Sequence, residues 1–237
     1  FINKMNNKQI LISIIIPSFN EGKTILEVLS RISQTVKPDL NYEVVVVDDG
    51  SKDNTLILLE QNKKLYNQLI SYEKNNGKGY AVKKGLEVAN GKYIFFQDAD
   101  LEYDPIEINK FASVINRFDP DVIIGSRFNY SEYTRSHSIL NKFGNILITL
   151  IFNLIYNTTF TDIYSCYACF KKELLDVESL KTIGFEQHAE ILCKVVKRGK
   201  KFYEVPISYN GRTQEEGKKI KFYHIFSVLF RIVSEKF

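Results

Sequence analysis

Residues 43–65 read EVVVVDDGSKDNTLILLEQNKKL, and this stretch indicates how the chain folds. Its first part, Glu43–Val47, is an apolar run without the alternation of a half-exposed strand, so we expect a strand that is buried on both faces. Asp48 and Asp49 follow, and after a turn Thr55–Leu65 places leucines along one side of a predicted helix. A buried strand followed by a helix is the repeating unit of a parallel sheet.

The same alternation extends in both directions. We expect further strands at Leu11–Ile16, Leu69–Glu73, Lys92–Gln97 and Asp121–Gly125, and helices at Glu21–Ser33, Tyr80–Ala89 and Pro105–Phe118. The rhythm changes after Gly125, where we expect helices at Leu140–Tyr156, Glu186–Arg198 and Phe222–Val233, with strands at Tyr164–Lys171 and Lys201–Tyr209. The predicted fold class is α/β, a mostly parallel Rossmann-like sheet with helices on both faces, in one domain over residues 1–237.

The composition of the chain limits the classes of function to be considered. The 237 residues are 44% hydrophobic and 25% charged, which is typical of a globular protein. A formal net charge of +4 is small for a nucleic-acid binder, so no nucleic-acid partner is expected. The chain has three Cys residues and no signal-peptide pattern in its first ten residues, and no apolar run is long enough to suggest a membrane span. We therefore expect a cytoplasmic location.

Three predicted strand ends carry polar residues, in the sequences PSFNE (17–21), DDGS (48–51) and QDADLE (97–102). Ligands of parallel α/β sheets bind beyond the carboxyl ends of the strands, so these residues should share one edge. Asp98 and Asp100 are two positions apart, and in extended backbone their carboxylates would point to the same side. Because like charges repel unless a cation lies between them, the pair predicts a site for a hard divalent cation such as Mg²⁺.

Three other sites are disfavoured. Residues 17–24, PSFNEGKT, form a P-loop except that its first Gly is Pro, which removes a backbone N–H. Residues 77–79 begin a G-x-G-x-x-G motif, but Val82 stands at its last position. A zinc set would have to combine Cys166, Cys169, His188 and Cys193, whose spacing suits no common finger. Buried cysteines and a packed or rim histidine are expected instead.

Six motifs stand in a characteristic order along the chain: IIIPSFNEGKTI (14–25), VVVVDDGSKDNT (44–55), NNGKGYAVKKGL (75–86), YIFFQDADLEYDP (93–105), VIIGSRF (122–128) and VPISYNGRTQEEGKKI (205–220). In this order they resemble the family 2 glycosyltransferases with the GT-A fold, and among these the polyprenyl-phosphate sugar synthases of the dolichyl-phosphate mannose or glucose synthase type. The resemblance covers Ile12 to about Lys221. It implies that about residues 10–128 form the half that binds the nucleotide sugar and the metal, and that about residues 129–237 form the half that binds the acceptor.

The resemblance implies roles for individual residues. The nucleotide would be bordered by Pro17, Phe19, Glu21, Lys78 and Gly79. Asp49 resembles the acid that hydrogen-bonds the base edge, and Asp98 the acid beside the ribose and the metal. Asp100 resembles the direct ligand of Mg²⁺ or Mn²⁺, with Glu102 as a further metal-side group. The resemblance also assigns phosphate binding to Arg127, Arg212 and Lys218, with Lys219 beside it.

The implied activity is inverting transfer of one sugar from a nucleotide-sugar donor, of the UDP-glucose or GDP-mannose type, to a dolichyl or undecaprenyl phosphate. The acceptor oxygen is then already ionised and needs no strong base. If the acceptor is instead a saccharide hydroxyl, a base is required, and Glu190, or less favourably Glu186, is the candidate. A non-catalytic nucleotide-sugar-binding protein is a second alternative. The chain has no Trp, so the Q-x-x-R-W motif of processive polysaccharide synthases is absent.

The helix expected near Leu140–Tyr156 is apolar except for a polar stripe at every fourth residue. The stripe consists of Asn141, Asn145, Thr149, Asn153 and Asn157. So wide an apolar surface is typical of a deeply buried helix or of one in a bilayer interface. The resemblance implies that this helix and the one at Phe222–Val233 lie at the cytoplasmic face of a membrane. The protein would be held there peripherally or by a membrane partner protein. The alternative is that the helices pack on the sheet or against a dimer partner. The stretch Arg135-Ser136-His137 lacks the paired basic residues that relatives often carry here.

Overall fold

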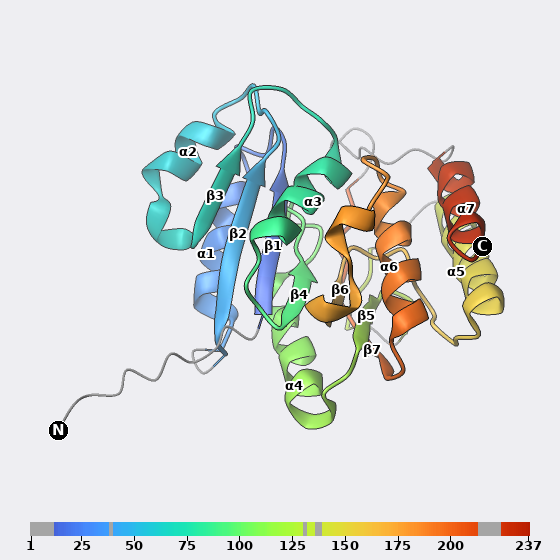
Figure 1. Cartoon of the computed structure of the whole chain (residues 1–237). Coiled ribbons are helices and arrows are strands. Elements are labelled where there is room, and N and C mark those ends of the chain that lie inside the picture. The colour runs from blue at the N-terminus through green and yellow to red at the C-terminus, as the bar shows by residue number, and fades with distance from the viewer. Residues whose placement is uncertain (1–11, 38–39, 130–131, 136–138, 213–223) are drawn as a thin grey trace.

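A computed structural model describes residues 12–37, 40–129, 132–135, 139–212 and 224–237. Its centre is a seven-stranded sheet in the order β3-β2-β1-β4-β6-β5-β7, with helices on both faces (Figure 1). The strands are β1 Ile12–Ser18, β2 Tyr42–Asp48, β3 Gln68–Ser71, β4 Tyr93–Phe96, β5 Val122–Ser126, β6 Ala168–Lys171 and β7 Phe202–Pro206. The helices are α1 Ile25–Thr35, α2 Thr55–Gln61, α3 Lys78–Val88, α4 Ile108–Phe118, α5 Ile139–Tyr156, α6 Gln187–Arg198 and α7 His224–Ser234.

The sheet is mostly parallel, as the sequence predicts. β1 pairs with β2 and β4 in parallel, β2 pairs with β3, and β5 pairs with β7. The exception is β6, which lies antiparallel between β4 and β5. β6 is also shorter than the predicted strand Tyr164–Lys171. The residues before Ala168 lie at the sheet edge where the other strands end.

Alternate side chains of each strand enter different cores. Ile14 and Phe95 pack into a core covered by α1 and α4, whereas Ile15 and Phe96 pack into one covered by α3, α5, α6 and α7. Burial on both faces explains why the strands lack an alternating pattern. Because both faces are covered, only the strand ends are left open to a ligand.

Helix α5 differs from an ordinary surface helix in which of its side chains are exposed to solvent. Its polar stripe faces the protein: Thr149 is buried and its Oγ1 accepts a hydrogen bond from the Ile163 N–H, while Asn153 donates to the Phe160 carbonyl. Apart from Lys142, the exposed side chains are apolar, namely Ile139, Leu140, Phe143, Ile146, Leu150 and Leu154. On length and composition alone, α5 is the one helix of the described residues that could cross a membrane, although the sequence expectation was that no segment qualifies.

Helix α7 extends this apolar surface. Figure 1 shows α7 beside α5 at the end of the molecule farthest from α2, and the two helices are in contact. Phe226, Phe230 and Val233 of α7 are exposed, whereas Val228 and Ile232 pack inward. Together α5 and α7 form an exposed apolar surface, here called the α5–α7 face.

Candidate active site

A cavity of about 440 Å³ lies at the sheet edge where β1, β2 and β4 end. Pockets of this size are typical of small-molecule and cofactor sites. The predicted site residues that line it are Pro17, Phe19, Glu21, Asp49, Lys78, Gly79, Asp98, Asp100, Glu102, Arg127 and Arg212. Glu190 is not among the lining residues, and Lys218 and Lys219 lie outside the described residues. Residues far apart in sequence thus meet at one edge, as the positions of the polar strand ends predict.

Asp49, at the end of β2, supports the loop that precedes α3. Its carboxylate accepts hydrogen bonds from the backbone N–H groups of Asn76 (3.0 Å) and Gly77 (2.8 Å). Gly77 has φ +103°, a conformation that favours glycine. Asp49 lines the cavity, but in this structure its oxygens hold the loop that positions Lys78.

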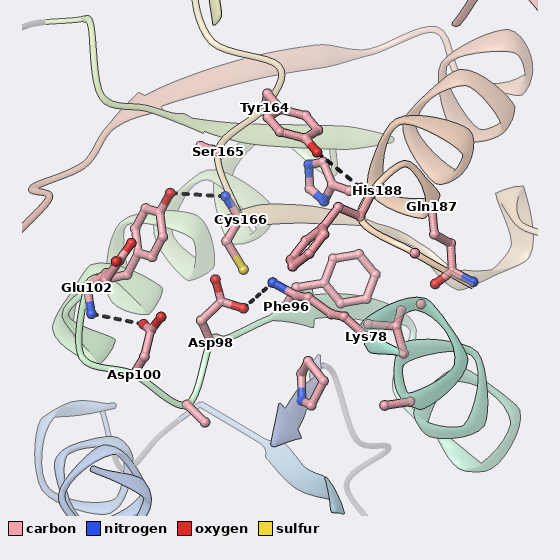
Figure 2. Close-up of a pocket in the computed structure, with 18 of the residues that line it drawn as sticks. Lys78, Phe96, Asp98, Asp100, Glu102, Tyr164, Ser165, Cys166, Gln187 and His188 are labelled. Carbon is pink, nitrogen blue, oxygen red and sulfur yellow. Dashed lines mark hydrogen bonds and ion pairs between the residues drawn. The ribbon is translucent and has the colours of Figure 1, made fainter. Parts of the chain in front are cut away.

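Lys78 begins α3 and pairs with Asp98, with 2.5 Å between Nζ and Oδ1 (Figure 2). Burial alone would raise the pKa of Asp98, but the Lys78 ammonium outweighs it and holds that pKa below its ordinary value. The charge of Asp98 is therefore balanced by a residue 20 positions earlier in the chain. The sequence places both residues at the site but gives no sign that they pair.

Arg212 lies among three carboxylates. Its guanidinium is 2.5 Å from Asp100, 3.3 Å from Glu102 and 3.6 Å from Glu21. Burial first, and then the charges of Asp98 and Glu102, raise the pKa of Asp100 to about 7 despite Arg212. The site thus holds more negative charge than its arginine balances, which favours a further cation.

The expected geometry of the D-x-D pair is wrong in one respect. β4 ends at Phe96, so Asp98–Asp100 lies in a turn and not in extended backbone, and Leu101 has φ +61°. Asp98 faces Lys78 while Asp100 faces Arg212, and among the described residues no group of three His, Cys, Asp or Glu side chains is arranged to hold a metal. The predicted set of Asp98, Asp100 and Glu102 therefore does not form a complete cage on its own. It does fit a hard cation that takes one or two carboxylates and completes its shell with phosphate oxygens.

Arg127 is fixed by a partner that sequence reasoning missed. It binds Asp162 through two parallel contacts, Nε–Oδ2 at 2.7 Å and Nη2–Oδ1 at 2.8 Å, and Asp162 is fully buried. The guanidinium also lies 5.1 Å from the ring centroid of Tyr209, which itself donates to Glu102. Arg127 lines the cavity with this edge of its guanidinium already paired, so its phosphate-binding role stays a prediction.

Glu190 is held by hydrogen bonds inside the protein. Its carboxylate is buried and accepts hydrogen bonds from the backbone N–H groups of Lys181 and Thr182, both at 2.9 Å, and from the Thr182 hydroxyl. Burial would raise its pKa, but these donors outweigh burial and lower it. A carboxylate whose oxygens already accept several hydrogen bonds, and which does not line the cavity, is poorly placed to accept a proton from a substrate. This placement weighs against the prediction that Glu190 is a base, and Glu186 does not line the cavity either.

The side of the cavity nearest α6 contains residues without a predicted role. Tyr164 and Cys166 precede β6, and His188 lies in the first turn of α6 (Figure 2). Cys169 and Cys193 are buried in the protein interior, as expected, and all three cysteines are free. Cys166 and His188 thus share the cavity without forming the zinc set that the spacing also disfavours. Helices α5 and α7 also contribute to the lining, with the apolar Ile148 and Ile225 and, from the polar stripe of α5, Asn141 and Asn145.

Comparison with known proteins agrees with this arrangement. The family model of glycosyl transferase family 2 matches residues 13–177. Dolichol-phosphate mannosyltransferase of Pyrococcus furiosus is 32% identical over 217 residues, covering 87% of this chain and 58% of that protein. Dolichyl-phosphate beta-glucosyltransferase of Saccharomyces cerevisiae is 29% identical over 231 residues, covering 86% of this chain and 68% of that protein.

A solved structure shares the fold. Glucosyl-3-phosphoglycerate synthase from Mycobacterium tuberculosis, crystallised with Mn²⁺, UDP and glucosyl-3-phosphoglycerate, superposes with a TM-score of 0.70. At 19% identity, over 95% of this chain and 79% of that one, the likeness shows the GT-A fold alone. The two dolichyl-phosphate transferases confirm the resemblance to polyprenyl-phosphate sugar synthases. The chain therefore belongs to glycosyl transferase family 2 and is a glycosyltransferase with the GT-A fold.

Proposed function

We propose that this glycosyltransferase moves one hexose, with inversion, from a nucleoside-diphosphate sugar to a polyprenyl phosphate at a membrane surface. The observation that carries the proposal is the joining of two environments in one cavity. The cavity holds the charged groups Lys78, Asp98, Asp100 and Arg212, and it also reaches Ile148 and Ile225, beside Asn141 and Asn145, on the two helices that form the α5–α7 face. A charged donor and an apolar acceptor chain need such a combination.

The charged groups of the cavity suit a nucleoside diphosphate. Lys78 and Arg212 are cations that can bind phosphate oxygens, and the loop that Asp49 holds brings Lys78 to the sheet edge. The excess negative charge around Asp100 suits Mg²⁺ or Mn²⁺ held by Asp100, Asp98 and the donor phosphates, with Glu102 nearby. A bound divalent cation would neutralise the charge that develops on the departing diphosphate. The known Mn²⁺ complex of the structurally similar synthase supports this assignment.

The chain's own residues would bind and orient the two reactants. Arg212 lines the cavity and would bind phosphate oxygens of the donor, while Asp100 and Glu102, with which it pairs in the free protein, would be available to a divalent cation. Arg127, fixed by Asp162, would hold the acceptor phosphate through its remaining N–H groups. A phosphate monoester has a second pKa near 6, so its oxygen is largely ionised at neutral pH and attacks without a protein base. A single in-line displacement then inverts the anomeric carbon.

The α5–α7 face supports a peripheral position at a membrane, which we propose to be on its cytoplasmic side. Most of its exposed side chains are large and apolar, and the same two helices contribute Ile148 and Ile225 to the cavity lining. Contiguous exposed apolar surfaces of this kind are typical of membrane or protein interaction sites. A polyprenyl chain lying in the bilayer could then present its phosphate to the cavity. The names of the two dolichyl-phosphate relatives support the same acceptor class.

The first experiment is a thermal-shift panel of UDP, GDP, CDP and dTDP, each with and without Mn²⁺. A ligand at a hundred times its dissociation constant adds roughly 2.7 kcal/mol of stability, which raises the melting temperature measurably. We expect one nucleotide to give a Mn²⁺-dependent shift that Asp100→Asn abolishes and that the control Asp176→Asn, an exposed carboxylate away from the cavity, retains.

The second experiment identifies the acceptor. The corresponding nucleotide sugar is supplied with polyprenyl phosphate in vesicles, and sugar that becomes extractable into organic solvent is measured. Transfer to the lipid is expected. Transfer to a soluble saccharide but not to the lipid would support the saccharide-hydroxyl alternative, and binding without transfer to either would support the non-catalytic alternative.

A further inference from the structure

Thr24 stands immediately before helix α1, but its hydroxyl does not cap that helix. A threonine in this position ordinarily accepts a hydrogen bond from a backbone N–H of the first turn. The Thr24 side chain makes no such bond. Its Oγ1 lies instead 2.7 Å from the backbone carbonyl oxygen of Ala99, a residue 75 positions away in the chain. The hydroxyl therefore joins the loop after β1 to the turn that contains Asp98 and Asp100.

The Ala99 carbonyl is the nearest acceptor for this hydroxyl, which has a single proton to donate. Two oxygens of Glu21 lie farther away, the carboxylate Oε2 at 3.2 Å and the backbone carbonyl at 3.3 Å. The distance to Ala99 is that of an ordinary O–H···O hydrogen bond. Ala99 itself is almost fully buried, so its backbone depends on donors from within the protein.

This hydrogen bond fixes the peptide plane that precedes Asp100. The carbonyl of Ala99 and the N–H of Asp100 belong to one planar unit, whose orientation sets the direction in which the Asp100 side chain leaves the backbone. Leu101, in the same turn, has φ +61°, a conformation that is uncommon for such a residue. Conformations of this kind persist where the surrounding contacts enforce them. The turn thus depends on contacts such as that of Thr24.

The loop that carries Thr24 is itself held by the residues that follow β2. Three consecutive backbone N–H groups of this loop donate to side chains there: Asn20 to Ser51 (2.9 Å), Glu21 to Thr55 (2.9 Å) and Gly22 to Asp53 (3.1 Å). The Thr24 hydroxyl is therefore carried by a loop that is fixed at three points. A group supported in this way can hold a neighbouring turn in one orientation.

We propose that Thr24 is a positioning residue for the divalent cation, because its hydroxyl holds the Asp98–Asp100 turn in the orientation in which these carboxylates bind the metal. The inference rests on the proposed function, which places a cation at Asp100 and Asp98 beside the donor phosphates. Thr24 does not line the cavity, so it acts through the backbone of the turn and not by contact with the metal. Removing a group that orients metal ligands typically lowers metal affinity roughly ten- to hundred-fold.

The test measures how strongly Mn²⁺ improves nucleotide binding. The dissociation constants of UDP, GDP, CDP and dTDP are measured by calorimetry without metal and with enough Mn²⁺ to saturate the nucleotide. Thr24→Val keeps the shape of the side chain and removes the hydroxyl, so the improvement caused by Mn²⁺ should shrink roughly ten- to hundred-fold. Binding without metal should stay within about two-fold of wild type. Thr24→Ser keeps the hydroxyl and should retain the Mn²⁺ effect within about three-fold.

Thr35→Val is the matched control. Thr35 lies on the same helix, and its hydroxyl donates to the Arg31 carbonyl, also at 2.7 Å, away from the cavity. This variant should show the full Mn²⁺ effect, so a loss of stability common to both valine variants cannot account for the result expected of Thr24→Val.

Three outcomes would overturn the inference. They are an unchanged Mn²⁺ effect in Thr24→Val, an equal loss of nucleotide affinity with and without Mn²⁺, and a loss in Thr24→Ser as large as that in Thr24→Val. If Mn²⁺ improves the binding of none of the four nucleotides to wild type, the metal site of the proposed function fails and the inference fails with it. That outcome is distinct, because it appears before any variant is made.

Discussion

The strand-end cavity and the α5–α7 face are built in opposite ways. In the cavity, charged groups are partly or fully buried and paired, as in Lys78–Asp98 and Arg127–Asp162. On the α5–α7 face, large apolar side chains are exposed and the polar stripe of α5 faces inward. An ordinary globular surface has neither feature in this concentration. In the cavity, charged side chains are stabilised by pairing with one another. On the α5–α7 face, apolar side chains are left exposed, so a molecule outside the chain can cover them.

The largest expected effect concerns the pairing in the cavity. Asp162→Asn leaves the Arg127 guanidinium without its counter-charge at a site where both side chains are nearly inaccessible. Breaking a buried pair in this way should lower the free energy of unfolding by about 3–5 kcal/mol, measured by denaturant titration. The control Asp176→Asn, at an exposed carboxylate, should stay within about 0.5 kcal/mol of wild type. A loss as small as that of the control would mean that the pair is not structural.

The second effect separates catalysis from stability within the same cavity. Asp100→Asn removes a carboxylate that burial and like charges destabilise, so the folded state should not weaken. Transfer should nevertheless fall roughly hundred- to thousand-fold, because the group that would hold the cation is lost. Steady-state rates and melting temperature are measured on the same preparation. Retention of most activity would remove Asp100 from the proposed metal site.

The third effect tests the α5–α7 face. Replacing Phe143 and Leu154 by Ser should weaken partition onto lipid vesicles roughly ten-fold, since both side chains are exposed and apolar. Stability in solution should change by less than about 0.5 kcal/mol. Ile57→Ser, at an exposed apolar residue on α2, is the matched control and should leave partition unchanged. Unchanged partition in the double variant, together with a change in oligomeric state, would instead make the face an interface between two copies.

The smallest expected effect on catalysis is that of Glu190→Gln. Because Glu190 does not line the cavity, transfer to a phosphate acceptor should stay within about three-fold of wild type, with an unchanged pH profile. A loss of several orders of magnitude would restore the base role.

The same variant should change the pH dependence of stability. The pKa of Glu190 is lowered in the folded state, so its stabilising contribution is present above the unfolded pKa and is lost as pH falls through the folded pKa. Below about pH 4.5, the pKa of an ordinary Glu, the free energy of unfolding should therefore fall less steeply in Glu190→Gln than in wild type. Denaturant titrations at several acidic pH values measure this slope, and equal slopes would contradict the assignment.

The sequence predicts the fold well because the apolar runs are unbroken. Every predicted strand and helix corresponds to one in the structure, and the polar strand ends meet as expected. The reversed direction of β6 could not be predicted, since a buried strand has the same pattern in either orientation. The turn at Asp98–Asp100 was also missed, because the apolar pattern does not show where β4 stops.

The site was predicted residue by residue but not pair by pair. The motifs identify Lys78, Asp98 and Asp100, whereas the contact between Arg212 and Asp100 joins residues 112 positions apart. Asp162 stands in no motif, and only its contact with Arg127 reveals its role. Ion pairs of this kind depend on the tertiary arrangement, which local periodicity does not contain.

The inward-facing stripe of α5 has a mechanical consequence. Thr149 accepts a hydrogen bond from the N–H of Ile163, and the next three residues of the chain, Tyr164, Ser165 and Cys166, line the cavity. One hydrogen bond therefore connects α5 to the segment that forms this wall of the cavity. A displacement of α5 would reach the wall without any movement of the sheet, so the cavity is rigid where strands build it and adjustable where this helix supports it.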